Sequence, residues 1–429
     1  MKRLVTHRRA RAARGALSGA IIAAAVALTA MPAAAEPHIG GMVRSSTAMN
    51  VDEDLDLELI RNVQTLRLDL SARVGSADMV ATPVLDVTAD GGVDIDLREA
   101  WVELFFPSAD LRIGKQQIVW GEADGAFITD IVSPRDLTDF ILPDFDEIRI
   151  GVPAARIDLY AGPFTAQAVW VPEFVPNRMP PPGSYWSRTP DFSGMPIEPS
   201  IDPTPQLPDR TLENSEVYGK LSYFSAAVNA EIMAAWAWDN EPVLSLEPTF
   251  SAPGVIESIE GTPTYERILV TGGSFSTTLG PLVWRNEAAL YFDRSFNTTD
   301  PFTDNAIAEH TQLHYLTGLD WSLAGADMSA QWIVNGILDH DDELIREQWE
   351  HTATARARRG FFGDRLTAEL FSYIGIDPWD TLLRPALTWA PDDGVELSLG
   401  ADIFLGDEEG RFGYFGDNNL VTAEARFYF

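Results

Sequence analysis

Apolar and polar residues alternate one by one along several segments of the chain. The closing segment is the clearest case, because residues 421, 423, 425, 427 and 429 are all apolar while Thr422, Glu424 and Arg426 lie between them. Segments 65–74 and 395–405 repeat the pattern. A period of two predicts β-strands with one apolar and one polar face. No apolar stretch of about 18 residues follows residue 36, so any membrane crossing is predicted to use strands.

The connections between these segments alternate between short and long. Tight turns are predicted at eight places: Gly75-Ser76, Pro107-Ser108, Gly162-Pro163, Ser225-Ala226, Gly280-Pro281, Gly325-Ala326, Gly363-Asp364 and Asp392-Asp393-Gly394. Outer-membrane barrels have this asymmetry between periplasmic turns and external loops. Eight hairpins plus one strand at each end predict an all-β fold. The predicted fold is a transmembrane, antiparallel, up-and-down β-barrel of about 18 strands (16–18).

Aromatic residues fall near the predicted strand ends, as in the girdles that mark the membrane interfaces. They are Trp101, Phe105, Phe106, Trp170, Trp236, Trp238, Trp284, Trp332 and Trp389. The chain also stops on Phe429, which resembles the signal read by the barrel-assembly machinery. We therefore predict a bacterial outer-membrane protein that contacts outer-membrane lipid and lipopolysaccharide and uses that machinery during biogenesis.

The first 35 residues predict a signal peptide. A basic start is followed by a short apolar run, and Ala33-Ala34-Ala35 gives a cleavage site before Glu36. Residues 36–429 are then expected to form a single barrel. The chain has no cysteine, which excludes disulfides and thiolate metal sites.

Charge narrows the function classes. A net charge of −33 argues against nucleic-acid binding. Acidic clusters such as 52–58, 339–347 and 407–409 are predicted on external loops, where they are candidates for surface Ca²⁺ or Mg²⁺. No other cofactor is expected. Catalytic motifs such as H-E-x-x-H and G-x-S-x-G are absent from the sequence, so we do not predict an enzyme.

The polar faces of the strands are predicted to line the lumen, where mixed charges form cross-strand ion pairs and set the field that selects solutes. The candidate lumen and constriction residues are Arg67, Arg73, Arg98, Arg156, Arg356, Arg358, Arg426, Glu103, Asp158, Glu369 and Glu424.

Two segments are too long for plain loops. Residues 122–150 mix apolar and acidic positions, and we predict that they fold into the lumen and narrow it; an external flap is the alternative. Residues 175–213 are rich in proline and are predicted to form a packed external cap.

The stretch 112–124, with Gly114-Lys115-Gln116 and Trp120-Gly121-Glu122, precedes Asp130-Ile131-Val132-Ser133-Pro134-Arg135-Asp136. It resembles a large, mostly uncharacterised family of porin-like proteobacterial outer-membrane proteins. These carry G-[KR]-Q-x-x-x-W-G-E and then D-x-x-[NS]-P-x-D on an insertion that enters the barrel. The resemblance implies a porin-like barrel with that insertion.

The residues of this stretch also suggest how the insertion is held. Gln116 is expected to bond to the insertion backbone and Trp120 to lie at the external rim. The charged anchors, expected to reach lumen arginines, are Glu122, Asp124, Asp130, Arg135 and Asp136.

We predict an outer-membrane channel for small or medium solutes, constricted by residues 122–150, with cations or neutral molecules favoured. The alternative is the outer-membrane part of an export or uptake system for hydrophobic molecules or lipids. That system would need a periplasmic or inner-membrane partner and an apolar pocket under the insertion. A third hypothesis is a structural or adhesive barrel whose lumen is plugged.

Overall fold

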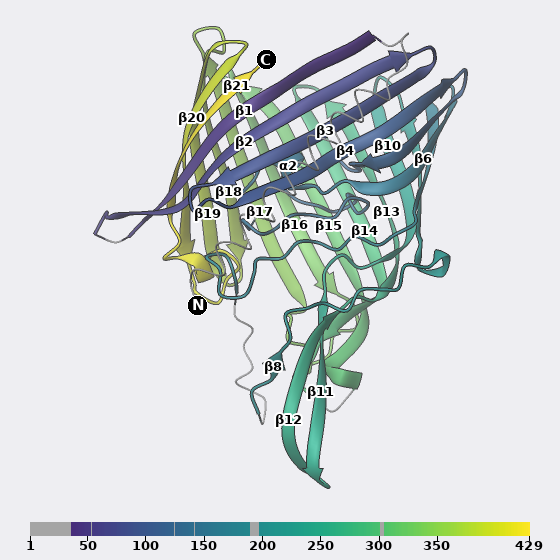
Figure 1. Ribbon diagram of the computed structural model, residues 1–429, viewed down its shortest axis with the longest axis vertical. Coiled ribbons are helices and arrows are strands. Elements are labelled where there is room, and N and C mark those ends of the chain that lie inside the picture. The colour runs from purple at the N-terminus through teal and green to yellow at the C-terminus, as the bar shows by residue number, and fades with distance from the viewer. Residues whose placement is uncertain (1–35, 53, 124, 141, 189–196, 301–303) are drawn as a thin grey trace.

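The chain forms a closed antiparallel β-barrel (Figure 1). The structure is a computed structural model that describes residues 36–52, 54–123, 125–140, 142–188, 197–300 and 304–429. The barrel sheet has 18 strands, each paired with its neighbours along the chain, and β1 pairs with β21 to close it. The predicted fold class and strand number are confirmed, and the predicted signal peptide 1–35 lies outside the described residues.

The barrel strands differ in length, and the longer ones begin or end in external loops. The 18 barrel strands are β1 (Glu36–Val51), β2 (Leu57–Val74), β3 (Ala77–Thr88), β4 (Val93–Phe106), β5 (Ala109–Gln116), β6 (Val152–Ala161), β7 (Phe164–Val171), β9 (Glu216–Phe224), β10 (Val228–Trp238), β13 (Arg267–Leu279), β14 (Leu282–Asn297), β15 (Ile307–Leu323), β16 (Ala326–Ile337), β17 (Trp349–Phe361), β18 (Leu366–Ile376), β19 (Trp379–Asp392), β20 (Val395–Gly406) and β21 (Leu420–Tyr428).

All eight predicted tight turns connect paired strands at one end of the barrel. Gly75 and Gly325, for example, have φ of +60° and +77°, a left-handed conformation that glycine adopts without steric cost. The long connections all lie at the other end. This local turn chemistry fixes which strands are neighbours.

The two faces of each strand separate as the alternation predicts. On β21, Phe427 is 53% exposed on the outside of the barrel, whereas Arg426 points inward and contacts an insertion residue. Outward aromatic residues include Phe106, Trp170, Trp236, Trp284, Trp332 and Trp389. Trp101 departs from the predicted girdle, because its ring lies against the guanidinium group of Arg112, whereas Trp236 and Trp238 share one face of β10 and both have rings near Arg267. Stacking on an arginine holds these rings in place.

Three further strands lie outside the barrel. The connection from β10 to β13 forms a hairpin of β11 (Val243–Ala252) and β12 (Val255–Thr264), which projects from the external end (Figure 1). Strand β8 (Ser200–Ile201), from the proline-rich segment, pairs with β12. The alternation of apolar and polar residues does not predict this extension, because residues 239–266 fall among the long connections between the predicted barrel strands.

The connection between β5 and β6 is the feature that positions the candidate site. It runs through the interior of the barrel and contains α2 (Phe145–Ile148). No helix within the described ranges is long and apolar enough to cross a membrane.

Candidate functional site

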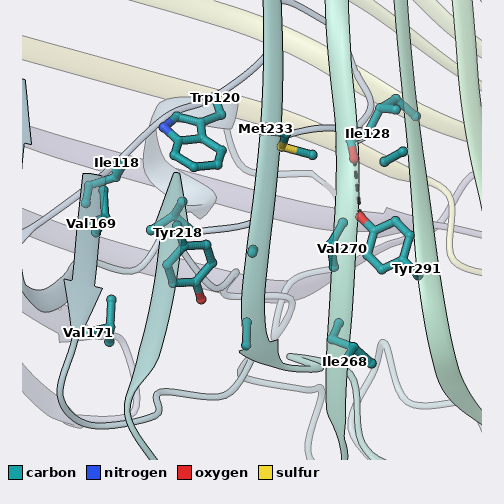
Figure 2. Close-up of a cluster of buried hydrophobic side chains, with 14 of the residues drawn as sticks. Ile118, Trp120, Ile128, Val169, Val171, Tyr218, Met233, Ile268, Val270 and Tyr291 are labelled. Carbon is teal, nitrogen blue, oxygen red and sulfur yellow. Dashed lines mark hydrogen bonds between the residues drawn. The ribbon is translucent and has the colours of Figure 1, made fainter. Parts of the chain in front are cut away.

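The residues that lead into the insertion, together with its first half, pack against an apolar patch on the inner wall of the barrel (Figure 2). Ile118, Trp120, Ile128 and Val132 are each 2% exposed. The inward wall positions they cover are Val169, Val171, Tyr218, Met233, Ala235, Ala237, Ile268, Val270, Ala289, Tyr291, Leu316 and Ile333. Burial of each large apolar side chain contributes roughly 1.5–3 kcal/mol. The insertion is therefore held mainly by the hydrophobic effect on this side.

Strand β14 adds polar contacts to the same side. The buried Glu287 carboxylate accepts hydrogen bonds from the Glu122 N–H (2.5 Å) and the Thr129 hydroxyl (2.8 Å). Arg285 donates to the Glu122 carbonyl (2.6 Å), and the Tyr291 hydroxyl donates to the Ile128 carbonyl (3.2 Å). These bonds satisfy insertion backbone groups that would otherwise be buried without partners.

The insertion also reaches other parts of the wall, at Gly125 and then along its second half. The Tyr373 hydroxyl of β18 donates to the Gly125 carbonyl (3.0 Å), and Arg384 of β19 donates to the Leu142 carbonyl (2.6 Å). Three carboxylates then meet three wall arginines. The pairs are Asp139 with Arg61 of β2 (2.9 Å), Asp144 with Arg426 of β21 (3.1 Å) and Glu147 with Arg44 of β1 (2.5 Å).

The electrostatics favour the ionised form of Glu147. Burial opposes that ionisation, but the adjacent Arg44 guanidinium outweighs it and holds the pKa of Glu147 below its ordinary range. Arg44 also lies 3.8 Å from Glu424, which in turn pairs with Arg426 at 2.5 Å. The wall and the insertion thus share one chain of alternating charges.

A second ionic cluster joins the insertion to the base of the external hairpin. Arg135 lies 3.6 Å from Glu241, which Arg294 of β14 approaches to 3.0 Å. Arg294 also pairs with Asp239 at 2.6 Å. Glu241 is partly exposed, and these arginines hold its pKa well below the usual range.

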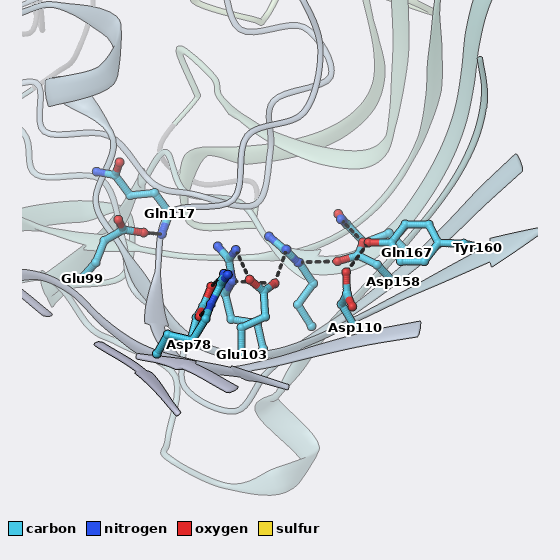
Figure 3. Close-up of polar contacts among 11 residues, drawn as sticks. Asp78, Glu99, Glu103, Asp110, Gln117, Asp158, Tyr160 and Gln167 are labelled. Carbon is cyan, nitrogen blue, oxygen red and sulfur yellow. Dashed lines mark hydrogen bonds and ion pairs between the residues drawn. The ribbon is translucent and has the colours of Figure 1, made fainter. Parts of the chain in front are cut away.

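Most of the other predicted lumen residues form ion pairs along the wall, and Figure 3 shows the group around Glu103 and Asp158. Glu103 accepts from Arg112 (2.8 Å) and Arg156 (3.2 Å), and Asp158 pairs with Arg156 at 2.8 Å. Elsewhere the pairs are Arg67–Asp69, Arg73–Asp78, Arg356–Glu369 and Arg358–Glu369. Arg98 is half-buried on β4 and has no ion pair with another described residue. Basic and acidic side chains are therefore interleaved along the wall.

A family model described as "Protein of unknown function (DUF1302)" matches residues 84–427. The chain belongs to this family. No curated protein matches the sequence.

Solved porin structures share the fold. Pseudomonas aeruginosa OccK8 (OprE) aligns with a TM-score of 0.55 and 10% identity over 92% of this chain and 98% of that chain. OpdK of the same organism, with vanillate, aligns with a TM-score of 0.52 and 9% identity over 92% and 98% of the two chains. OccK2 (OpdF), in complex with glucuronate, gives 0.52 and 9% over 92% and 97%.

OpdK is an outer-membrane protein. At such low identity the likeness concerns the fold. In a closed barrel the backbone groups of each strand bond to the neighbouring strands, as hydrocarbon requires. The outer surface of this barrel also exposes large apolar side chains. The chain is accordingly a porin-like barrel of the bacterial outer membrane.

Several predicted anchors act differently from the prediction. Gln116 is fully buried and donates to the Ala154 carbonyl of β6, while its neighbour Gln117 donates to the insertion at the Arg149 carbonyl (2.5 Å). Trp120 does not lie at the rim, because its ring is buried in the apolar patch and its indole N–H donates to Gln167 (2.6 Å). Strand register decides which of two adjacent glutamines faces the insertion.

The predicted charged anchors also have other partners. Asp130 pairs with Arg149 inside the insertion (2.7 Å), and burial raises the pKa of Asp130 against the effect of that arginine. Asp136 pairs with Arg178 of the proline-rich segment (3.1 Å). Glu122 is held through its backbone, and Asp124 lies outside the described residues.

The carboxylates that do reach wall arginines come later in the chain. In the sequence, Asp139, Asp144 and Glu147 stand only among the acidic positions of residues 122–150. Three acids in a segment predicted to enter an arginine-containing lumen were the available signal. Their individual partners depend on the path of the insertion, which no local pattern reveals.

Proposed function

We propose that the chain is a solute channel that the 122–150 insertion constricts. The supporting observation is that this insertion is attached around the wall, from β14 through β18, β19 and β21 to β1 and β2. A segment with anchors on so many strands crosses the lumen. It therefore leaves only passages beside it for small solutes.

We further propose that neutral or cationic solutes are favoured. In a mixed lumen, a free arginine attracts anions, whereas a paired one contributes little net field. Arg44 and Arg426 are paired with the insertion's own carboxylates, all the predicted lumen arginines except Arg98 have a carboxylate partner among the described residues, and the chain carries a net charge of −33. Vanillate and glucuronate, found with OpdK and OccK2, are carboxylates. We expect this channel to differ from those two proteins in that preference.

The experiment is single-channel recording in planar bilayers with a potassium chloride gradient. The wild-type protein is expected to give small, cation-selective steps. Replacing residues 122–150 by a short glycine-serine linker should raise the conductance several-fold. The matched control removes the β11–β12 hairpin, which lies outside the barrel, and should keep the wild-type step size. Absence of a pore in both proteins, or anion selectivity of the wild type, would refute the proposal.

A second candidate function is passage of hydrophobic molecules, with a periplasmic or inner-membrane partner. The apolar inner wall under the insertion favours it, because aqueous pores are lined mostly by polar side chains. On this view the insertion covers a hydrophobic path until the partner delivers cargo.

The wall itself offers a test of this second function. Met233 and Val270 lie on the inner face under the insertion, where they are buried. In the linker variant, the fluorescent probe N-phenyl-1-naphthylamine should bind to the uncovered wall, and Val270→Asp should abolish that binding. Equal fluorescence with and without the aspartate would count against a hydrophobic path.

A further inference from the structure

An aromatic cage lies at the external end of the barrel. Its four rings are Trp186 of the proline-rich segment, Phe404 of β20, and Phe412 and Phe415 of the last external loop. Their exposed fractions are 6%, 1%, 1% and 5%. Three separate parts of the chain therefore bury their rings at one place.

One residue of the insertion fills this cage. The Phe140 ring lies 5.0 Å from Phe415 and 6.0 Å from Trp186, centroid to centroid, and is nearly parallel to the indole at 15°. Phe404 and Phe412 follow at 6.3 and 6.2 Å. These separations lie within the range of favourable aromatic pairs. The side chain of Phe140 is nevertheless only partly buried.

Phe140 occupies the cage at a conformational cost. Its φ is +58°, in the left-handed region, which a bulky side chain rarely adopts. Such strain persists only where the surroundings enforce it, and it concentrates at binding sites and switches. The insertion is also held by the Leu142 carbonyl and by Asp139 and Asp144, so the ring is not needed to keep this segment in the lumen.

The cage is built without help from Phe140. Trp186 lies 5.6 Å from Phe404 and 5.5 Å from Phe415, so three of the four rings support one another, and the Phe412 ring lies 5.4 Å from Tyr373 of β18. The buried Asp380 carboxylate accepts the Phe412 N–H at 2.5 Å and fixes the last loop. Asn418 donates to the Tyr185 carbonyl (2.6 Å) and ties the proline-rich segment to that loop.

We infer that the cage is a binding subsite for the uncharged aromatic ring of a solute, and that Phe140 occupies it in the absence of ligand. Ring binding by the cage does not depend on the proposed channel function, but the expected consequence of binding, which is opening of the channel, rests on it. A ring that enters displaces Phe140, relieves its backbone strain and frees the adjoining part of the insertion. The Arg411 guanidinium, 5.5 Å from the Phe412 ring, adds a cation–π contact at the edge of the cage.

Binding is measured by ¹⁹F NMR on purified protein in detergent, with 4-fluorobenzyl alcohol as probe. Phe140→Ala removes the ring that competes with the probe, so the probe should bind roughly tenfold more tightly. An aromatic contact contributes a free energy that corresponds to about this ratio of dissociation constants. Phe140→Ala combined with Phe415→Ala should return binding to the wild-type value or weaker. Phe127→Ala is the matched control, because Phe127 belongs to the same insertion but packs on Arg135 and Arg149.

Folding of each variant is checked by the shift in gel mobility between unheated and heated samples. Phe140→Leu, which keeps most of the volume, provides a second variant and should bind the probe with intermediate affinity. Equal binding by wild type and both variants, or equal competition by non-aromatic cyclohexylmethanol, would overturn the inference. Probe binding in this pattern without a pore in bilayers would refute the channel alone, and a pore without probe binding would refute the cage alone.

Discussion

Replacing Glu147 by glutamine tests whether the ion pairs between insertion and wall hold the channel closed. Glu147 and Arg44 are joined at 2.5 Å, and their side chains are 24% and 13% exposed. The other two pairs are more open to water, with Asp139 at 30% and Asp144 at 66%. Exposed pairs contribute little. We therefore expect Glu147 to matter most of the three.

The size of the effect follows from what the substitution leaves behind. Loss of one partner from a charged hydrogen bond costs about 1–3 kcal/mol. Arg44 keeps a weaker partner in Glu424 at 3.8 Å, and glutamine keeps the volume of the side chain. We take about 1.5 kcal/mol, which is about a tenfold change in the ratio of detached to attached insertion. The open fraction in single-channel records should rise by that factor.

The control lies in the same short helix. Asp146 has a 99% exposed side chain and is 3.6 Å from Arg149, so Asp146→Asn removes the same charge at little cost. A double-mutant cycle with Arg44→Gln isolates the pair from the general loss of charge. If Asp146→Asn and Glu147→Gln raise the open fraction equally, or neither does, the reasoning about this ion pair is wrong.

Three further outcomes are expected. Glu287→Leu and Glu287→Met each leave the N–H of Glu122 and two donors of Thr129 without an acceptor, so channel opening should increase about tenfold in both variants; unchanged records would contradict this. Because the pKa of Glu147 is held low, its ion pair is complete at neutral pH and is lost as the pH falls through that lowered pKa, so opening should rise only under acidic conditions, and less so in Glu147→Gln. Phe429 lies against Gly41 at the seam of the barrel, so Phe429→Ala should lower the amount of folded protein in outer-membrane fractions several-fold, with Phe429→Trp as control.

The strands and their order could be read from the sequence because both depend on neighbouring residues. Alternation places every second side chain on one face, and a two-residue turn with a left-handed glycine forces the next strand to pair with the last. The extension at β11–β12 is not predicted, because a long connection between predicted strands carries no signal that separates a loop from a hairpin outside the membrane.

The candidate site depended on contacts between distant segments. Gln116 and Gln117 are adjacent, yet one bonds to β6 and the other to the insertion. The aromatic cage brings residues 140, 186, 404, 412 and 415 together, and no spacing in the chain connects them. Such arrangements become visible only when the barrel has closed and the loops have met.

The sequence by itself determined the class of the molecule. Period-two patterning, with short turns alternating with long connections, predicts a closed barrel, an arrangement that satisfies backbone hydrogen bonds in lipid. The tertiary structure decided where the insertion lies, which carboxylates meet Arg44, Arg61 and Arg426, and that Phe140 fills a cage of rings. The physical reason is range: hydrogen bonding along a strand is local, whereas packing and charge pairing across a lumen join residues a hundred or more positions apart.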